Sequence, residues 1–246
     1  MEEEKKKAAF PALLLIIGLA VASFFIWLFA ELAEELLENE LRKFDETIIG
    51  FFNSVANSAL DMFFLIITEL GSVRFLTALS VLALLLLWFK AKDKWGILFF
   101  VIAVGGGSLL TLLLKNLYDR RRPSINESID AVGYSFPSGH SMGSLLFYGF
   151  IGYFAVRSRL KKRVKVLILI ILAALVVLIG TSRIYLGAHF PSDVIAGYIA
   201  GTIWLILCLL ALEWAQWQSG SHVRPVQVMR RFLVSSFQST KKRIRR

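Results

Sequence analysis

Three short clusters of polar residues carry most of the residue types in this chain that could do chemistry. Each cluster contains a cation or a histidine at the end of an apolar run, where charge is costly and usually functional. The clusters are Lys115–Pro123, Pro137–His140 and Ser182–Asp193. Arginine forks match phosphate oxygens bidentately, and lysine adds a point charge. Lys115, Arg122 and Arg183 therefore predict a site for a phosphate group.

The third cluster pairs a histidine with a carboxylate. His189 and Asp193 are four residues apart across Pro191, a spacing that suits the start of a helix. A carboxylate at this reach can accept a hydrogen bond from one imidazole nitrogen, fix the tautomer and raise the nucleophilicity of the other nitrogen. Of the three histidines in the chain, only His222 lies outside the clusters, in a polar tail.

The sequence Pro137-Ser138-Gly139-His140 is expected to open a helix. Ser138 is a plausible N-cap, and the free backbone N–H groups at such a helix start bind anions. Gly139 allows the backbone to approach an oxyanion closely. An ordinary helix cap would explain Ser138, but it does not explain His140 in the first turn beside an apolar run.

A metal site is the main chemical alternative. His140, His189 and Asp193 do not form a tight ligand set, and three cations accompany them. Cations around an anion site favour phosphate over a divalent metal. We therefore expect no metal and no other cofactor. Arg120 and Arg121 belong to the first cluster, but whether they contact a substrate is open at this point.

The elements that must position these clusters are helices that cross a membrane. Hydrophobic residues make up 57% of the 246 residues and charged residues only 19%, which is too little charge for a soluble domain of this length. The apolar residues fall in long runs that predict six transmembrane helices. The runs are Ala8–Ala30, Phe75–Phe89, Gly96–Leu114, Ser141–Val156, Val166–Thr181 and Val194–Leu212.

Two of the apolar segments need separate interpretation. Ala8–Ala30 is longer than the apolar region of a cleavable signal peptide, which is about 7–15 residues, so we expect a retained anchor. Ala59–Leu70 is broken by Asp61 and Glu69. It either dips into the membrane interface or forms a span of its own.

Basic residues predict the orientation. The loop Arg157–Lys165 carries six basic residues and the stretch from Arg224 to Arg246 carries eight, and such clusters collect in the cytoplasm. Six spans place every basic cluster and both termini inside and the three polar clusters outside, whereas seven spans do not. The net charge of +10 is then explained by orientation and not by nucleic acid binding. We expect one transmembrane domain over residues 1–246, whose basic cytoplasmic tail begins at about residue 214 and either lies on the inner membrane surface or is solvated.

Taken together, the three clusters resemble the signature of the type 2 phosphatidic acid phosphatase superfamily in order, residue types and spacing. The matching parts are Lys115-x6-Arg122-Pro123, Pro137-Ser138-Gly139-His140 and Ser182-Arg183-x5-His189-x3-Asp193. The resemblance extends from about the second span to the end of the sixth. It implies an all-α polytopic membrane protein with six transmembrane helices and short interfacial helices. The compact size and short loops are similar to bacterial members that act on phosphatidylglycerol phosphate or undecaprenyl diphosphate.

The resemblance also implies roles for the residues of the signature. His189 would attack phosphorus and form a phosphohistidine, with Asp193 orienting its ring. His140 would protonate the leaving oxygen and later serve as base for the hydrolytic water. The remaining residues would hold the phosphoryl oxygens, and they are Lys115, Arg122, Ser138, Gly139 and Arg183.

Three alternatives accompany this interpretation. Soluble vanadium-dependent haloperoxidases share the signature, but six apolar spans argue against them. A non-catalytic lipid-phosphate binding or transport protein would use the same cations, but it would not need the pair His189 and Asp193. Among substrates entering from the bilayer, the sequence does not separate phosphatidylglycerol phosphate, undecaprenyl diphosphate and phosphatidic acid, although the first two are favoured. It makes no prediction of the oligomeric state.

Overall fold

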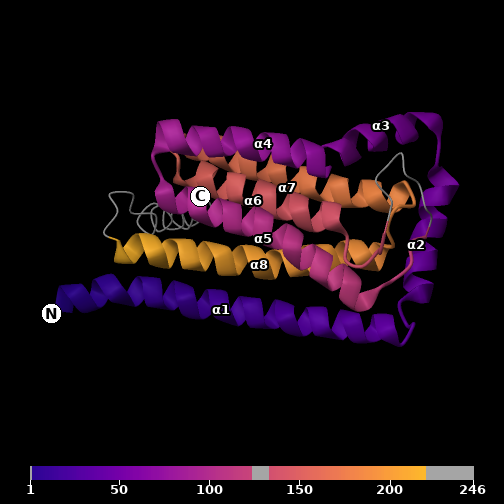
Figure 1. The fold of residues 1–246 in the computed structure, drawn as a ribbon, viewed down its shortest axis with the longest axis horizontal. Helices are drawn as coiled ribbons and strands as arrows, with labels where there is room; N and C mark the ends of the chain where they lie inside the picture. Colours follow the sequence, from indigo (N-terminus) through magenta and orange to yellow (C-terminus); the bar gives the residue numbers. More distant parts are fainter. Residues whose placement is uncertain (1, 124–132, 220–246) are drawn as a thin grey trace, which may run out of the picture.

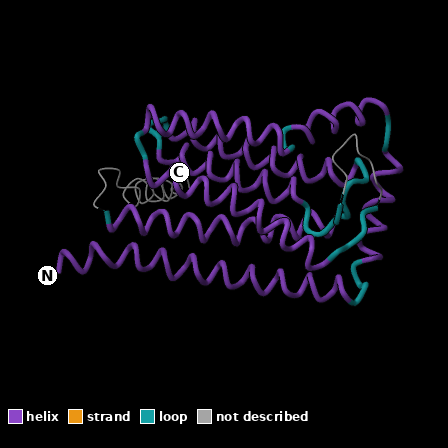
Figure 2. Tube along the Cα trace, viewed as in Figure 1, coloured by secondary structure: helices purple, strands orange, loops and turns teal. Residues whose placement is uncertain are grey.

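The computed structural model describes residues 2–123 and 133–219, and all of their regular structure is helical. The helices pack as an elongated bundle (Figures 1 and 2). They are α1 Glu2–Leu37, α2 Arg42–Val55, α3 Ser58–Glu69, α4 Val73–Leu86 with the π-helical turn η1 Leu87–Ala91, α5 Lys94–Tyr118, α6 Gly139–Arg157, α7 Lys162–Tyr185 and α8 Pro191–Gln218. The predicted all-α class is confirmed. His222 and most of the predicted basic tail lie outside the described residues. Helix α8 continues to Gln218, past the predicted start of that tail at about residue 214.

Five helices in the described part of the chain are long and apolar enough to cross a membrane. They are Leu15–Leu37, Val73–Ala91, Lys94–Tyr118, Lys162–Tyr185 and Pro191–Gln218. The protein is therefore a multi-pass membrane protein. Helix α6 contains the remaining predicted span, but its first two turns are rich in serine, glycine and histidine, which lowers its hydropathy. The count of six spans stays a prediction.

The polarity of α6 follows from its place in the bundle. It lies among α5, α7 and α8 (Figure 1), and Ser141 and Ser144 are completely buried. Other helices, and not lipid, cover these polar groups. A helix enclosed in this way does not need a wholly apolar surface.

The segment Ala59–Leu70 corresponds to α3, which is too short to form a span of its own. Its 12 residues are about 18 Å long, against a hydrocarbon core of about 30 Å. Helix α2 runs across the same end of the bundle between α1 and α3 (Figure 1). The hydroxyl of Tyr185 on α7 donates to Asp61 Oδ1 at 2.6 Å and thereby ties α3 to the bundle.

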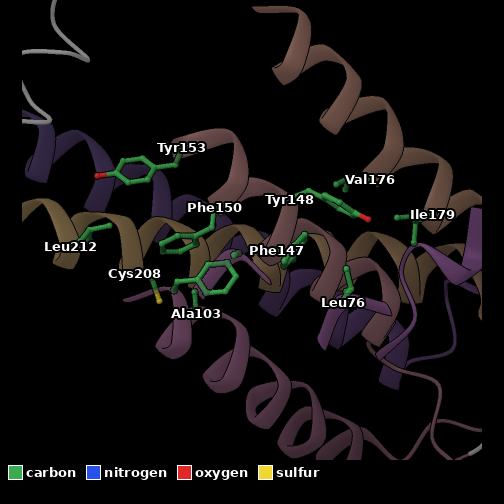
Figure 3. Close-up of a cluster of buried hydrophobic side chains, with 12 residues drawn as sticks. Leu76, Ala103, Phe147, Tyr148, Phe150, Tyr153, Val176, Ile179, Cys208 and Leu212 are labelled. Carbon is green, nitrogen blue, oxygen red and sulfur yellow. The ribbon is translucent and has the colours of Figure 1, made fainter. Parts of the chain in front are cut away.

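Aromatic side chains of α6 form the centre of the core (Figure 3). Phe147 and Phe150 each pack edge-on against Phe100 of α5, with ring centroids 5.9 Å apart. Glycines bring the neighbouring helices close: a Cβ atom on Gly197 of α8 would lie 2.7 Å from the carbonyl oxygen of Ser138. The start of α6 is therefore held directly against the start of α8.

The three polar clusters lie at one end of the bundle, as predicted. This end contains the C-terminal ends of α5 and α7 and the N-terminal ends of α6 and α8 (right in Figure 1). The basic loop at residues 157–165 lies at the opposite end. The length of the bundle therefore separates the candidate site from the basic loop at residues 157–165.

Candidate active site

The third cluster places a histidine and an aspartate in contact at the start of α8. Asp193 is in the first turn, and its Oδ2 accepts from the Phe190 N–H at 2.8 Å, which fixes the carboxylate at the helix N-terminus. His189 Nδ1 lies 3.5 Å from the same oxygen. The hydroxyl of Ser135 donates to Asp193 Oδ2 and is 3.3 Å from His189 Nδ1. All three side chains are buried.

The surroundings of His189 indicate which nitrogen carries the proton. Its Nε2 is 3.0 Å from Arg122 Nη1, and a guanidinium can only donate. Nε2 must therefore present its lone pair, which leaves the proton on Nδ1, facing Asp193. Burial lowers the pKa of His189 to about 3, even though the hydrogen bond to Asp193 acts in the opposite direction. The ring is thus neutral near pH 7 and has the tautomer that a nucleophile needs.

The cations of the first cluster converge on the same place. Lys115 Nζ donates to the carbonyl oxygens of Tyr134 and Ser135, the latter at 3.4 Å. Arg122 Nε donates to the Gly133 oxygen at 2.9 Å, and its Nη1 donates to the Ala188 oxygen at 2.8 Å. Because these acceptors belong to the two loops around the site, the two cations hold those loops in position.

The second cluster forms the helix start that the sequence predicts. Ser138 is the N-cap of α6, and its Oγ accepts from the Ser141 N–H at 3.4 Å and from the Ser141 hydroxyl at 3.0 Å. The Ser138 N–H donates to the backbone oxygen of Asp193 at 2.9 Å, which joins the second cluster to the third. His140 makes no hydrogen bond to the residues that the structure describes, so its ring nitrogens are available to a bound group.

A cavity of about 560 Å³ lies between α4, α5 and α6 and brings five of the predicted residues together. The five are Lys115, Arg122, Gly139, His140 and His189. A Cβ atom on Gly139 would make only an ordinary contact with Thr111, so the glycine leaves its face of the cavity open. The rest of the wall is largely apolar and includes Leu76, Val104 and Leu112. A volume of this size is typical of a small-molecule site.

Three predicted residues lie behind the cavity wall and do not line it. Arg183 is completely buried, and its Nη1 donates to Thr68 Oγ1 of α3 at 2.8 Å. Ser138 is equally buried and caps α6. Asp193 reaches the cavity only through His189. Among the residues left open, Arg121 is exposed, whereas Arg120 points away from the cavity and contacts Asp193.

The sequence missed three buried residues that contact the site, namely Asp45, Thr68 and Ser135. Thr68 and Ser135 gave no signal, because short polar residues are common in helices and loops. For Asp45 the sequence did contain a signal. Asp45 lies on the same face of α2 as the apolar residues Ile48, Ile49 and Phe52. A carboxylate on the inward face of an amphipathic helix must find a buried partner.

No group of three or more histidine, cysteine, aspartate or glutamate side chains in residues 2–123 and 133–219 could hold a metal ion. The candidate site instead combines two histidines with cations. Metal independence itself stays a prediction, which activity measurements can check.

Comparisons with known proteins agree with this geometry. A model of the PAP2 superfamily matches residues 94–217. The chain belongs to the PAP2 superfamily. Phosphatidylglycerophosphatase B of Bacillus subtilis is 34% identical over 181 residues, which cover 73% of this chain and 88% of that protein. Undecaprenyl-diphosphatase of Sulfolobus acidocaldarius is 33% identical over 134 residues, which cover 52% of this chain and 60% of that protein.

A solved structure has a similar fold. The crystal structure of a transmembrane PAP2 type phosphatidylglycerolphosphate phosphatase from Bacillus subtilis matches with a TM-score of 0.70 at 30% identity, over 76% of this chain and 94% of that one. The family resemblance that the three clusters predict is thus confirmed. This PAP2 protein is a membrane hydrolase that acts on phosphoric esters.

Proposed function

We propose that this PAP2 protein removes the terminal phosphate from phosphatidylglycerol phosphate through a phosphohistidine on His189. The observation that carries the proposal is the placement of His189, whose Nδ1 faces Asp193 while its Nε2 faces a cavity lined by Lys115, Arg122 and His140. The names of the Bacillus subtilis relative and of the solved structure support this lipid.

The first chemical step is attack of His189 Nε2 on phosphorus. The N–P bond forms as the bond from phosphorus to the lipid oxygen breaks. His140 gives its proton to that oxygen, so the lipid leaves as an alcohol. Asp193 accepts the hydrogen bond from Nδ1 and stabilises the positive charge that develops on the ring. The phosphoryl group supplies the negative charge that balances a protonated His140 among the cations.

The second step is hydrolysis of the phosphohistidine. The now neutral His140 takes a proton from water, and the water oxygen attacks phosphorus while the N–P bond breaks. Inorganic phosphate forms, and both histidines return to their starting states. Lys115 and Arg122 stay within reach of the phosphoryl oxygens in both steps and stabilise the charge of the transition states. The open face of Gly139 leaves room for one of these oxygens.

The shape of the cavity supports a lipid substrate that enters from the bilayer. Lys115 and Arg122 lie beside the histidines, whereas Leu76, Val104 and Leu112 extend the wall along α4 and α5. Leu112 is more than half exposed on the outside of the bundle, so the cavity borders the surface that faces lipid. A phosphate headgroup can then sit among the cations while its chains stay in the membrane.

Undecaprenyl diphosphate is a second candidate, which the name of the Sulfolobus acidocaldarius relative supports. Arg74 lines the cavity in addition to the predicted cations. A diphosphate carries a second anionic group that a further cation could contact. The same two steps would apply, with a lipid monophosphate as the leaving group.

The site is proposed to face away from the cytoplasm. The support is the basic loop at residues 157–165 at the opposite end of the bundle, since basic loops collect in the cytoplasm. Cysteines introduced at Ser124 and Ser158 should then react with a membrane-impermeant reagent from opposite sides. Labelling of both positions from one side would contradict this orientation.

Phosphate release from purified lipids tests the proposed function. The wild-type protein should hydrolyse phosphatidylglycerol phosphate faster than undecaprenyl diphosphate or phosphatidic acid, in the presence of EDTA, and a His189→Ala variant should release none. Rapid quenching should trap an acid-labile phosphoenzyme at His189. A lipid-phosphate binding or transport protein would instead bind the lipid without releasing phosphate. Loss of activity on chelation would show that a metal is required.

A further inference from the structure

The carboxylate of Asp193 is held from the side opposite His189 by Arg120, which occupies an unspecified position within the family signature. Arg120 Nη1 donates to Asp193 Oδ1 at 2.6 Å, whereas His189 faces Oδ2. The Arg120 guanidinium also lies 4.0 Å from the centroid of the Phe190 ring. One oxygen of Asp193 is thus assigned to the arginine and the other to the histidine.

A second carboxylate, from α2, completes this arrangement. Asp45 Oδ2 accepts from Arg120 Nη2 at 2.7 Å and from the Ser192 hydroxyl at 2.7 Å, and Asp45 Oδ1 accepts from the Ser192 N–H at 2.9 Å. Arg120 Nη1 donates to the same hydroxyl at 2.7 Å. Asp45 is 1% exposed, so its charge depends on these partners.

We propose that Asp45 and Arg120 are positioning residues that hold the Asp193 carboxylate, and through it the ring of His189, in the geometry for attack. This inference rests on the proposed function, in which His189 is the nucleophile. Asp45 lies before residues 94–217, so α2 completes the active site from outside the matched family region.

Charge explains why both residues are needed. Arg120 is a single cation between two buried carboxylates, and its planar guanidinium sets the plane in which each carboxylate lies. When Asp45 loses its charge, Arg120 interacts more strongly with Asp193. Asp193 then becomes a weaker acceptor for the proton on His189 Nδ1, and it stabilises the developing imidazolium less. Asp45 also binds the N-terminus of α8, which carries Asp193.

The effect should appear in catalysis and not in substrate binding. Asp45 and Arg120 do not line the cavity that contains His189; they line a separate pocket of about 420 Å³, to which Phe190 also contributes. We therefore expect Asp45→Asn to lower kcat by about 10- to 100-fold, as small displacements of a reacting group do, and to leave KM unchanged. Arg120→Lys should act in the same direction, because one ammonium group cannot bridge both carboxylates in the same way.

A neighbouring residue provides the control. Glu46 is exposed, and its carboxylate pairs with Arg42 on the surface of α2. Glu46→Gln removes one negative charge from the same helix, next to Asp45, and should leave kcat and KM at their wild-type values. A fall in kcat with Glu46→Gln as large as that with Asp45→Asn would assign the effect to the charge of α2 in general and overturn the proposal.

A double-mutant cycle separates positioning from a general loss of structure. In an Asp193→Asn background, Asp45→Asn should lower kcat little further, because both changes act on one hydrogen bond to His189. If the double variant instead lost kcat by the product of the two single-variant factors, Asp45 would not act through Asp193. If Asp45→Asn does not fold, Ser192→Ala is the second variant. It removes the hydroxyl bridge but no charge, and it should lower kcat less, again without changing KM.

The two levels of the proposal fail in different ways. Wild-type kcat in both Asp45→Asn and Arg120→Lys, together with an inactive His189→Ala, would overturn the positioning role and leave the proposed function intact. Substantial activity in His189→Ala would overturn the proposed function itself.

Discussion

At one end of the bundle cations line a cavity beside two histidines, whereas at the other end the cation that lines a smaller cavity, of about 220 Å³, pairs with a carboxylate. Arg157 Nη2 lies 3.3 Å from Asp93 Oδ2, and its Nη1 donates to the Tyr153 hydroxyl at 3.2 Å. Gln216 donates to the same aspartate at 3.2 Å. Lys115 and Arg122, at the first end, instead line the 560 Å³ cavity beside the histidines.

The two ends differ in what accompanies the cation, which is a carboxylate beside Arg157 and two histidines beside Lys115 and Arg122. Each end contains an ion pair and hydroxyl side chains among apolar helices. The presence of polar residues therefore does not by itself distinguish the candidate site from the opposite end. At the Arg157 end the carboxylates are part of the fold. At the His189 end the phosphate of the substrate is expected to complete the charge balance. The predictions below test this difference.

The largest expected effect is loss of the nucleophile. His189→Ala should lower kcat by about 10⁶-fold, the scale seen when a covalent enzyme loses its attacking residue. Steady-state phosphate release from lipid vesicles measures it, with size-exclusion elution as the check of folding. The comparison between the ends would fail if this variant kept substantial turnover, because the cavity would then not be the reaction site.

The next largest effect belongs to His140, and it should depend on the substrate. As the general acid, His140 should be worth about 10²–10⁴-fold on a lipid phosphate monoester, whose alkoxide leaving group needs a proton. His140→Ala should lose less on p-nitrophenyl phosphate, whose leaving group is stable without one. The ratio of the two losses is the measurement. Equal losses on both substrates would assign His140 a role other than proton transfer to the leaving group.

The sequence predicted the parts of this site that depend on local spacing. His189 and Asp193 are four residues apart at a helix start, and Ser138 caps the helix that presents His140, so short-range rules place all four. Asp45 reaches Ser192 across 147 positions of sequence, and no local pattern encodes such a contact. Contacts of this kind are determined by how the helices pack.

For the fold, the sequence predicted where the helices lie but not where each helix ends. Each predicted span lies within a helix, because long apolar runs are visible in composition. The helix ends were predicted less well: α1 continues to Leu37, beyond Ala30, through glutamates that are good helix formers. Helix α6 is less apolar than the other predicted spans because neighbouring helices cover its serines. The sequence alone does not reveal that packing.

A smaller effect, on stability alone, is expected at the opposite end. Arg157→Met removes the cation that pairs with Asp93, whose side chain is only 11% exposed. It should lower the free energy of unfolding by about 3 kcal/mol, while kcat and KM of the folded protein stay unchanged. Thermal unfolding in detergent measures the change. Arg159→Met, at an exposed position of the same loop, should have no effect on stability. A fall in kcat for folded Arg157→Met would show that the two ends are coupled.

The last prediction is that His189 does not change its protonation between pH 5 and pH 8. An ordinary histidine has a pKa of about 6.5 and changes charge between pH 5 and 8. Burial lowers the pKa of His189 to about 3, so its neutral form should persist throughout that range and gain a proton only in strong acid. Imidazole ¹⁵N resonances of the labelled protein, assigned with His189→Ala, should show Nδ1 protonated and Nε2 unprotonated at both pH 5 and pH 8.

In Asp193→Asn the amide can donate to Nδ1, which favours the opposite tautomer, with the lone pair facing away from the cavity. That variant should therefore show the proton on Nε2, together with a reduced kcat. A His189 midpoint near 6.5 in the wild-type protein would mean that water reaches the ring freely and that the proposed nucleophile is not enclosed.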